Sequence, residues 1–289
     1  MRRVDQYKAQ QGFFTIAQNT PDVDYLRLAY LQALSIKITM PDSLYAVAVD
    51  KNTLALVTEE HRRVFDYVIT IENDQAINDE WKLSNEWQAF HLTPFKETIK
   101  LESDIVFTRS IAHWWTTFRL KNIVLSLGCR DYLGNLSSDR TYRQVFDDNQ
   151  LPDVYNGLMY FRYSQEAAEF FWWAQQIFQN WATVKDQLIK CHDEQPTTDV
   201  VYALAAKIIG EETCTIPGVD FINFTHMKPK INKFSTATPW HNLVVYETPT
   251  PMVRINNINQ YHPLHYQDKT WVTDDLIKEY ADEFASLAR

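Results

Sequence analysis

Short apolar segments alternate with segments of helical periodicity along the chain, and this alternation restricts the fold more than any other sequence feature. Residues 20–38 open on Thr-Pro-Asp, a typical helix start, and then carry Leu and Ile at the three- and four-residue spacing of one helix face. The apolar segments have the length and composition of buried strands, at residues 13–17, 45–50, 67–71 and 98–101. Strands separated by helices predict an α/β fold, with a mostly parallel central sheet flanked by helices.

The second half of the chain carries further periodic segments. Helices are predicted over residues 165–188, 199–209 and 273–288, and a strand over residues 219–224. The sequence contains no repeat and no Gly/Ser-rich linker, so a single domain with a C-terminal extension is expected.

Composition excludes several classes of protein. The 45% hydrophobic content of the 289 residues can fill a core, and the net charge of -9 argues against a protein that coats nucleic acid nonspecifically. Three cysteines without a CxxC spacing favour reduced thiols over a disulfide framework. The longest apolar cluster, residues 170–174, is too short to span a bilayer, so we expect a soluble, cytoplasmic protein.

Two carboxylates follow the fourth predicted strand, at Glu102 and Asp104. Ligands of open α/β sheets collect at the carboxyl ends of the strands, and Mg²⁺ or Mn²⁺ prefers carboxylate oxygens. The pair therefore predicts a metal site. An acid pair at a strand end is also common in solvated turns, and that interpretation stays open.

A second candidate lies downstream, where His226 precedes Lys228 by two residues. An imidazole can complete a carboxylate metal site, and a lysine can offset the charge of phosphate oxygens. The alternative is a hydrogen-bonded structural histidine.

Polar residues at two other positions could face a substrate. Asp193, Glu194 and Gln195 precede a predicted helix whose first turn contains Asp199, and acids there also serve as capping or dipole residues. The dipeptide Asn156-Gly157 is typical of a turn before a strand.

Taken in order, these segments resemble the GT-A glycosyltransferases, and in particular family eight, the glycogenin and galactosyltransferase-like group. The resemblance covers residues 13–230. It rests on a nucleotide-binding strand and turn, a DxD-like metal motif, an Asn-x-Gly segment, an acid-Gln pair and a closing His…Lys-Pro motif, at residues 14–19, 100–107, 155–161, 194–195 and 226–229.

The resemblance implies a Rossmann-like transferase core over residues 1–230, with residues 231–289 as an extension packed on it. It also implies a nucleotide-diphosphate sugar as donor, a UDP-sugar being favoured, and Mn²⁺ or Mg²⁺ as cofactor. The implied nucleotide-binding residues are Thr15, Ala17, Gln18, Asn19, Asp50 and Lys228. The implied metal ligands are Glu102, Asp104 and His226. The implied catalytic residues, which would line the sugar and acceptor pocket, are Asn156, Asp193, Glu194 and Gln195.

The acceptor is left open by the sequence. The style of the sequence resembles transferases of large tailed phages, which makes hydroxymethylated pyrimidine in phage DNA one candidate. In that case phosphates would be contacted by Arg109, Arg119, Arg130, Arg140 and Arg143. A glycan or small-molecule acceptor, and a binding protein that keeps the fold without activity, are the alternatives.

Overall fold

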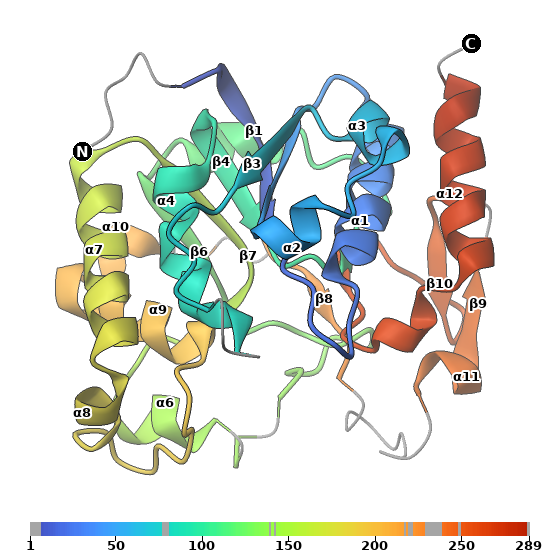
Figure 1. The fold of residues 1–289 in the computed structure, drawn as a ribbon. Helices are drawn as coiled ribbons and strands as arrows, with labels where there is room; N and C mark the ends of the chain where they lie inside the picture. Colours follow the sequence, from blue (N-terminus) through green and yellow to red (C-terminus); the bar gives the residue numbers. More distant parts are fainter. Residues whose placement is uncertain are drawn as a thin grey trace.

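A central sheet with helices on both faces forms the body of the molecule in the computed structural model (Figure 1). The structure describes residues 7–76, 81–138, 140–141, 143–216, 218, 222–228, 239–247 and 250–287. The predicted α/β class and mostly parallel sheet are confirmed.

The central sheet has six strands in the order β3-β2-β1-β4-β7-β6. Strands β3, β2, β1 and β4 run parallel, and β7 is antiparallel to both β4 and β6. The carboxyl ends of β1, β2 and β4 therefore meet at one edge, beside the amino end of β7. The strands are β1 (Ala9–Ile16), β2 (Tyr45–Val49), β3 (Tyr67–Thr70), β4 (Phe95–Leu101), β6 (Ile123–Leu127) and β7 (Val154–Arg162).

Both faces of this sheet are buried because helices cover each of them, and successive strand residues point to opposite faces. Phe13 of β1 packs into one hydrophobic core and the next residue, Phe14, into the other. This arrangement explains why the strands read as continuous apolar runs.

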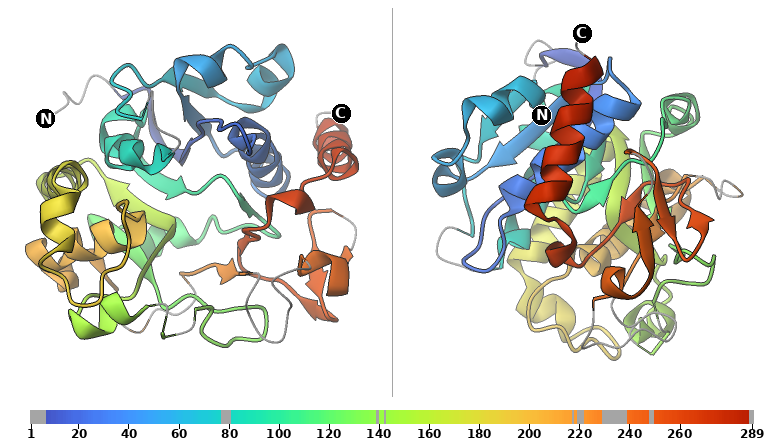
Figure 2. Two further views of the ribbon diagram at one scale, coloured as in Figure 1. Left: turned by 60° about the horizontal axis from the view of Figure 1, so that its bottom comes forward. Right: turned by 90° about the vertical axis from the view of Figure 1, so that its right-hand side faces the viewer.

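The helices divide between the two faces. One core contains side chains of α1, α5 and α12, and the other contains side chains of α4, α7 and α9. The C-terminal helix α12 lies beside α1, although the two are far apart in sequence (Figures 1 and 2). The helices are α1 (Tyr25–Thr39), α2 (Lys51–Leu54), α3 (Glu59–Val64), η2 (Lys82–Gln88), α4 (Ala89–Leu92), α5 (Trp114–Phe118), α6 (Gln144–Asp148), α7 (Gln165–Gln179), α8 (Trp181–Lys185), α9 (Thr198–Ile209), α10 (Glu211–Cys214), α11 (His241–Val244), η3 (Lys269–Trp271) and α12 (Asp274–Leu287).

Two small sheets accompany the main one. The first has the order β5-β12-β8 and the second β11-β10-β9. Their strands are β5 (Ile105–Val106), β8 (Thr225–His226), β9 (Val245–Glu247), β10 (Val253–Ile255), β11 (Ile258–Asn259) and β12 (Leu264–His265). The first small sheet joins segments from the middle and the end of the chain.

Two helix predictions were wrong in their limits. The helix predicted over residues 165–188 is interrupted at Asn180, whose amide closes α7 on the carbonyl of Gln176 before α8 begins. The first helix begins at Tyr25 rather than at Thr20, because Asp24 supplies the N-cap and accepts a hydrogen bond from the Arg27 amide.

The turn predicted at Asn156-Gly157 was also wrong, since both residues lie inside β7. A Cβ atom at Gly157 would lie 2.5 Å from the Phe224 ring, so glycine is needed there to admit that ring. The strand predicted at residues 219–224 falls partly outside the described residues, and the strand that the structure contains, β8, begins at Thr225.

Within the described part of the chain, no helix is both long enough and apolar enough to cross a membrane.

Candidate metal and donor site

The turn between β4 and β5 presents both predicted metal-binding acids. The Glu102 amide still bonds to the β7 strand, at the Gly157 carbonyl 3.0 Å away. The Gln32 amide of α1 donates to the carbonyls of Glu102 and Ile105, at 2.6 and 3.1 Å. A buried helix side chain therefore fixes the turn that carries the carboxylates at the carboxyl edge of the sheet.

A histidine from the end of the chain reaches the same place. His265 lies on β12, which pairs with β5 on one side and with β8 on the other. The amide of Tyr266 donates to the carbonyl of Asp104 at 3.2 Å. These backbone bonds place the His265 ring against the acids.

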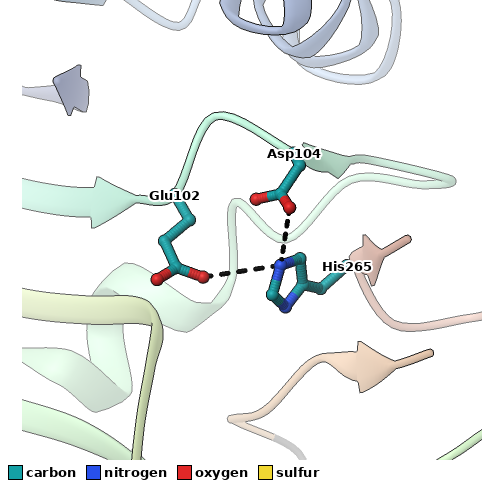
Figure 3. A group of neighbouring side chains, drawn as sticks. All are labelled: Glu102, Asp104 and His265. Carbon is teal, nitrogen blue, oxygen red and sulfur yellow. Dashed lines mark ion pairs between the residues drawn. The ribbon is translucent and has the colours of Figure 1, made fainter. Parts of the chain in front are cut away.

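Glu102, Asp104 and His265 point toward one another (Figure 3). His265 Nε2 is 3.0 Å from Asp104 Oδ2 and 3.4 Å from Glu102 Oε2, and one ligand atom from each residue lies within 4.8 Å of the others. Two carboxylates and one imidazole are a donor set that suits Mg²⁺ or Mn²⁺ and leaves coordination positions for phosphate oxygens. The residues thus fit the divalent metal that the sequence predicts.

Charge is unevenly distributed over the group. Burial alone would raise the pKa of Asp104, but its interactions with His265 and Lys269 outweigh that effect and hold the pKa well below its usual range. Burial raises the pKa of Glu102, and the nearby Asp104 carboxylate adds to the shift. The Lys269 ammonium contacts Asp104 directly, and this ion pair raises the lysine pKa against the effect of burial.

A series of buried polar side chains holds Glu102 in place. Asn156 donates from Nδ2 to Glu102 Oε1 at 3.2 Å, and its Oδ1 accepts from Lys100 Nζ at 3.1 Å. Lys100 is fully buried and pairs with Glu86. Asn156, predicted to line the substrate pocket, therefore contacts a candidate metal ligand.

His226, predicted as a metal ligand, contacts His265 on the side of its ring that faces away from the two acids. Its side chain is buried, and its Nδ1 is 2.6 Å from Nδ1 of His265. The structure thus places His265, rather than His226, beside the two acids. Burial, followed by the nearby charges of His265 and Lys228, holds the pKa of His226 well below its usual value.

A cavity of about 330 Å³ opens over the acids. Gln18 and Tyr25 line it together with all three members of the group. Its other lining residues are Ile16, Thr20, Trp81, Lys82, Leu83, Glu86, Ser103, Gln267 and Lys269. A larger cavity, of about 730 Å³, opens beside the edge strand β6, and it is not lined by Glu102, Asp104 or His265. The smaller cavity is the candidate site because the charged groups converge there.

The residues predicted to bind the nucleotide differ in their surroundings. Thr15 and Ala17 are fully buried, and the Thr15 hydroxyl donates to the Leu101 carbonyl at 2.6 Å, so both belong to the packing of the sheet. Gln18 lines the cavity and donates to Asp50 Oδ2 at 3.2 Å.

Asn19 and Asp50 hold the backbone near that edge. Asp50 caps α2 by accepting from the Thr53 amide at 2.7 Å. Asn19 accepts from the Leu26 amide at 2.9 Å and so ties the loop to α1. Their contacts shape the loops around the cavity.

The remaining predicted pocket residues are not brought to the cavity. Asp193, Glu194 and Gln195 are absent from its lining, and Glu194 is exposed and paired with Lys185. Asp199 in the first turn of α9 lies nearer, since its Oδ1 accepts from the Asn156 amide at 2.7 Å.

Lys228 belongs to the same region as Asp199. Burial lowers its pKa, and the negative charges of Asp199 and Glu102 oppose that shift. The lysine is thus close enough to the acids to be influenced by them.

The arginines predicted to contact DNA phosphates are largely engaged within the protein. Arg143 is buried in ion pairs with Asp153 and Asp199. Arg140 pairs with Asp147 and Asp153, and Arg119 with Glu97. The two others contact Gly134 (Arg130) and the Tyr261 ring (Arg109). Three of the five are thus paired with carboxylates inside the protein, and contacts of these arginines with DNA phosphates stay a prediction.

Sequence reasoning missed His265 and Lys269. The one signal available was their spacing, since a histidine that ends a short strand stands four residues before a lysine. That signal is weak by itself, because it becomes meaningful only when β12 is known to lie beside β5.

Comparison with known proteins agrees with the fold. No protein-family model and no curated protein matches the sequence. The crystal structure of the galactosyltransferase LgtC in complex with donor and acceptor sugar analogues superposes with a TM-score of 0.57 at 12% identity, over 95% of each chain. The chain has the GT-A glycosyltransferase fold.

A second glycosyltransferase gives a similar match. The glycosyltransferase GlyE of Streptococcus pneumoniae TIGR4 superposes with a TM-score of 0.50 at 9% identity, over 97% of this chain and 64% of GlyE. The predicted GT-A architecture is therefore confirmed, and the site described above lies at the carboxyl edge of its sheet.

Proposed function

We propose that this protein is a metal-dependent glycosyltransferase that moves a sugar from a nucleoside-diphosphate donor to an acceptor hydroxyl. The observation that carries the proposal is the convergence of Glu102, Asp104 and His265 in a cavity at the carboxyl edge of a GT-A sheet. These three residues would hold Mg²⁺ or Mn²⁺. A divalent cation bound there would neutralise the diphosphate and make it a better leaving group.

The chain's own cations would assist the departing diphosphate. Lys269 lines the cavity beside Asp104, and Lys228 lies within electrostatic reach of Glu102. An ammonium near a leaving phosphate stabilises the charge that develops as the bond to the sugar breaks. Lys269 and Lys228, from separate segments of the chain, would thus place positive charge near the diphosphate.

The nucleoside would occupy the part of the cavity lined by Gln18 and Tyr25. Gln18 is held by Asn85, which donates to its Oε1 at 2.8 Å, and by its own bond to Asp50. A fixed amide and a half-buried aromatic ring suit a flat polar base, and a uracil base is the one that the family resemblance favours.

We favour a glycan or small-molecule hydroxyl as acceptor over a base in DNA. The supporting observation is the pairing of Arg119, Arg140 and Arg143 with carboxylates of the protein, which offsets positive charge that a DNA backbone would need. A DNA acceptor would make activity fall steeply with added salt because counterions are released on binding.

The test measures donor binding and donor hydrolysis together. Thermal unfolding is followed with UDP-, GDP-, CDP- and ADP-sugars, each with and without Mn²⁺, and release of the nucleoside diphosphate is followed in parallel. A ligand that binds only the folded state raises the unfolding temperature. We expect one donor class to raise it only with Mn²⁺ and to be hydrolysed.

Asp104→Asn is expected to abolish both effects, whereas Asp282→Asn on the exposed face of α12 serves as the matched control and should preserve them. Binding without hydrolysis or transfer would favour the binding-protein alternative. No metal-dependent binding of any donor would sink the proposal.

A further inference from the structure

A second buried histidine contacts the candidate metal group without belonging to it. Strands β8 and β12 run parallel with His226 opposite His265, so the two side chains lie on the same face of the small sheet. Their exposed fractions are 4% and 6%, and their Nδ1 atoms are 2.6 Å apart. That distance is a hydrogen bond, so one ring donates and the other accepts.

The position of the acids decides which ring must donate once a cation is bound. Nε2 of His265 faces Asp104 and Glu102 at 3.0 and 3.4 Å, so Nε2 is the nitrogen available to a cation at that site. A ligating nitrogen carries no hydrogen, and a neutral imidazole then carries its hydrogen on the other nitrogen. His265 must therefore donate from Nδ1, and the Nδ1 atom in front of it belongs to His226.

We propose that His226 is a positioning residue whose neutral ring accepts a hydrogen bond from His265 Nδ1 and thereby holds His265 Nε2 toward the metal. This inference rests on the metal site of the proposed function. Partners of this kind fix the tautomer and the orientation of a ligating histidine, and they raise its basicity as a ligand.

Aromatic rings around His226 hold its imidazole in place. The Phe224 and Tyr155 rings pack edge-on against it, with ring centroids 5.9 and 5.8 Å away, and restrict rotation of the imidazole. Phe224 also packs against His265, with ring centroids 5.7 Å apart, so one aromatic ring contacts both imidazoles.

A purely structural histidine would predict a different outcome on substitution. If His226 only filled space, its replacement by an apolar residue would change stability and leave metal affinity intact. If it accepts from His265, the loss of the acceptor must weaken metal binding even where the fold is preserved.

The experiment compares Mn²⁺ binding, measured from the free-ion electron paramagnetic resonance signal, in four proteins: wild type, His226→Leu, His226→Asn and His265→Ala. His226→Leu removes the acceptor and should weaken Mn²⁺ binding about 10- to 100-fold, the range for loss of a ligand's hydrogen-bond partner. His226→Asn places an acceptor oxygen near the former Nδ1 and should recover most of the affinity. Circular dichroism and urea unfolding check that each variant folds.

A second measurement needs no variant. Long-range ¹H–¹⁵N correlation spectra of the Mg²⁺-bound wild type should show His265 protonated at Nδ1 and His226 protonated at Nε2. A folded His226→Leu protein with wild-type Mn²⁺ affinity, or His226 protonated at Nδ1 in the Mg²⁺ complex, would overturn the inference while the metal site stands. Equal, negligible Mn²⁺ binding by wild type and His265→Ala would overturn the metal site of the proposed function, and the inference with it.

Discussion

The buried ion pair between Lys100 and Glu86, which is linked to Glu102 through Asn156, leads to a specific prediction about stability. Lys100 projects from β4 into the interior with no exposed side-chain surface, and its partner Glu86 on η2 is 9% exposed. The same ammonium donates to Asn156 Oδ1 at 3.1 Å. One lysine thus neutralises a buried carboxylate and orients the amide that contacts Glu102.

Lys100→Met keeps the length of the side chain and removes its charge. The substitution leaves the Glu86 carboxylate buried without its partner, and breaking one side of a buried pair costs about 3–5 kcal/mol. The Asn156 oxygen loses its donor as well, and an unsatisfied buried acceptor accounts for about 1–3 kcal/mol of such a loss. We therefore expect the free energy of unfolding to fall by about 3–5 kcal/mol.

Urea unfolding followed by tryptophan fluorescence measures the change, with the free energy extrapolated linearly to water. Glu86→Gln introduced together with Lys100→Met removes the orphaned charge, so the double variant should recover about half of the loss. A single variant that loses less than about 1 kcal/mol, or a double variant less stable than the single one, would refute the reasoning that charge pairing governs this site.

Two further predictions concern other parts of the fold. Gly157→Ala should lower the free energy of unfolding by about 1–3 kcal/mol, because the new methyl would overlap the Phe224 ring at 2.5 Å; urea unfolding measures it, and an unchanged midpoint would contradict the packing argument. Burial lowers the pKa of His262, so the unfolded chain, with a histidine pKa of about 6.5, binds a proton that the folded chain resists. Stability should accordingly fall as the pH drops from about 7.5 to 5.5, and His262→Gln should reduce that fall; equal pH dependence in both proteins would exclude this residue as a cause.

Much of the sheet could be predicted because its strands are buried on both faces. An apolar run such as residues 45–50 can be recognised as a buried strand without knowing its partner strands. The helix that connects two successive strands makes those strands parallel. The interruption at Asn180 was missed because the apolar spacing continues across it into α8.

The acids of the site could be predicted and the histidine could not. Glu102 and Asp104 are adjacent to a long strand that has a clear sequence signal. His265 lies on a strand of two residues, which is too short for any periodicity, and its partner strands are remote in sequence. Predicting it required tertiary pairing, which no local pattern encodes.

Thr15 shows the converse case, in which a polar residue near the predicted site turned out to face inward. Neighbouring strand residues point to opposite faces, and both faces of this sheet are buried, so a side chain inside β1 faces one core or the other. Gln18, beyond the end of β1, escapes this alternation and reaches the cavity.

The position of β12 also has a consequence for how the site comes into existence. Chains fold as they leave the ribosome, and the parallel strands β1 to β4 are made first. The segment that carries the two acids is therefore synthesised long before His265 and Lys269, and the candidate cation site is complete only when β12 has paired with β5. A chain cut between residues 162 and 265 would keep all six strands of the central sheet and lack the third candidate ligand, so the proposed cation site would be incomplete in it.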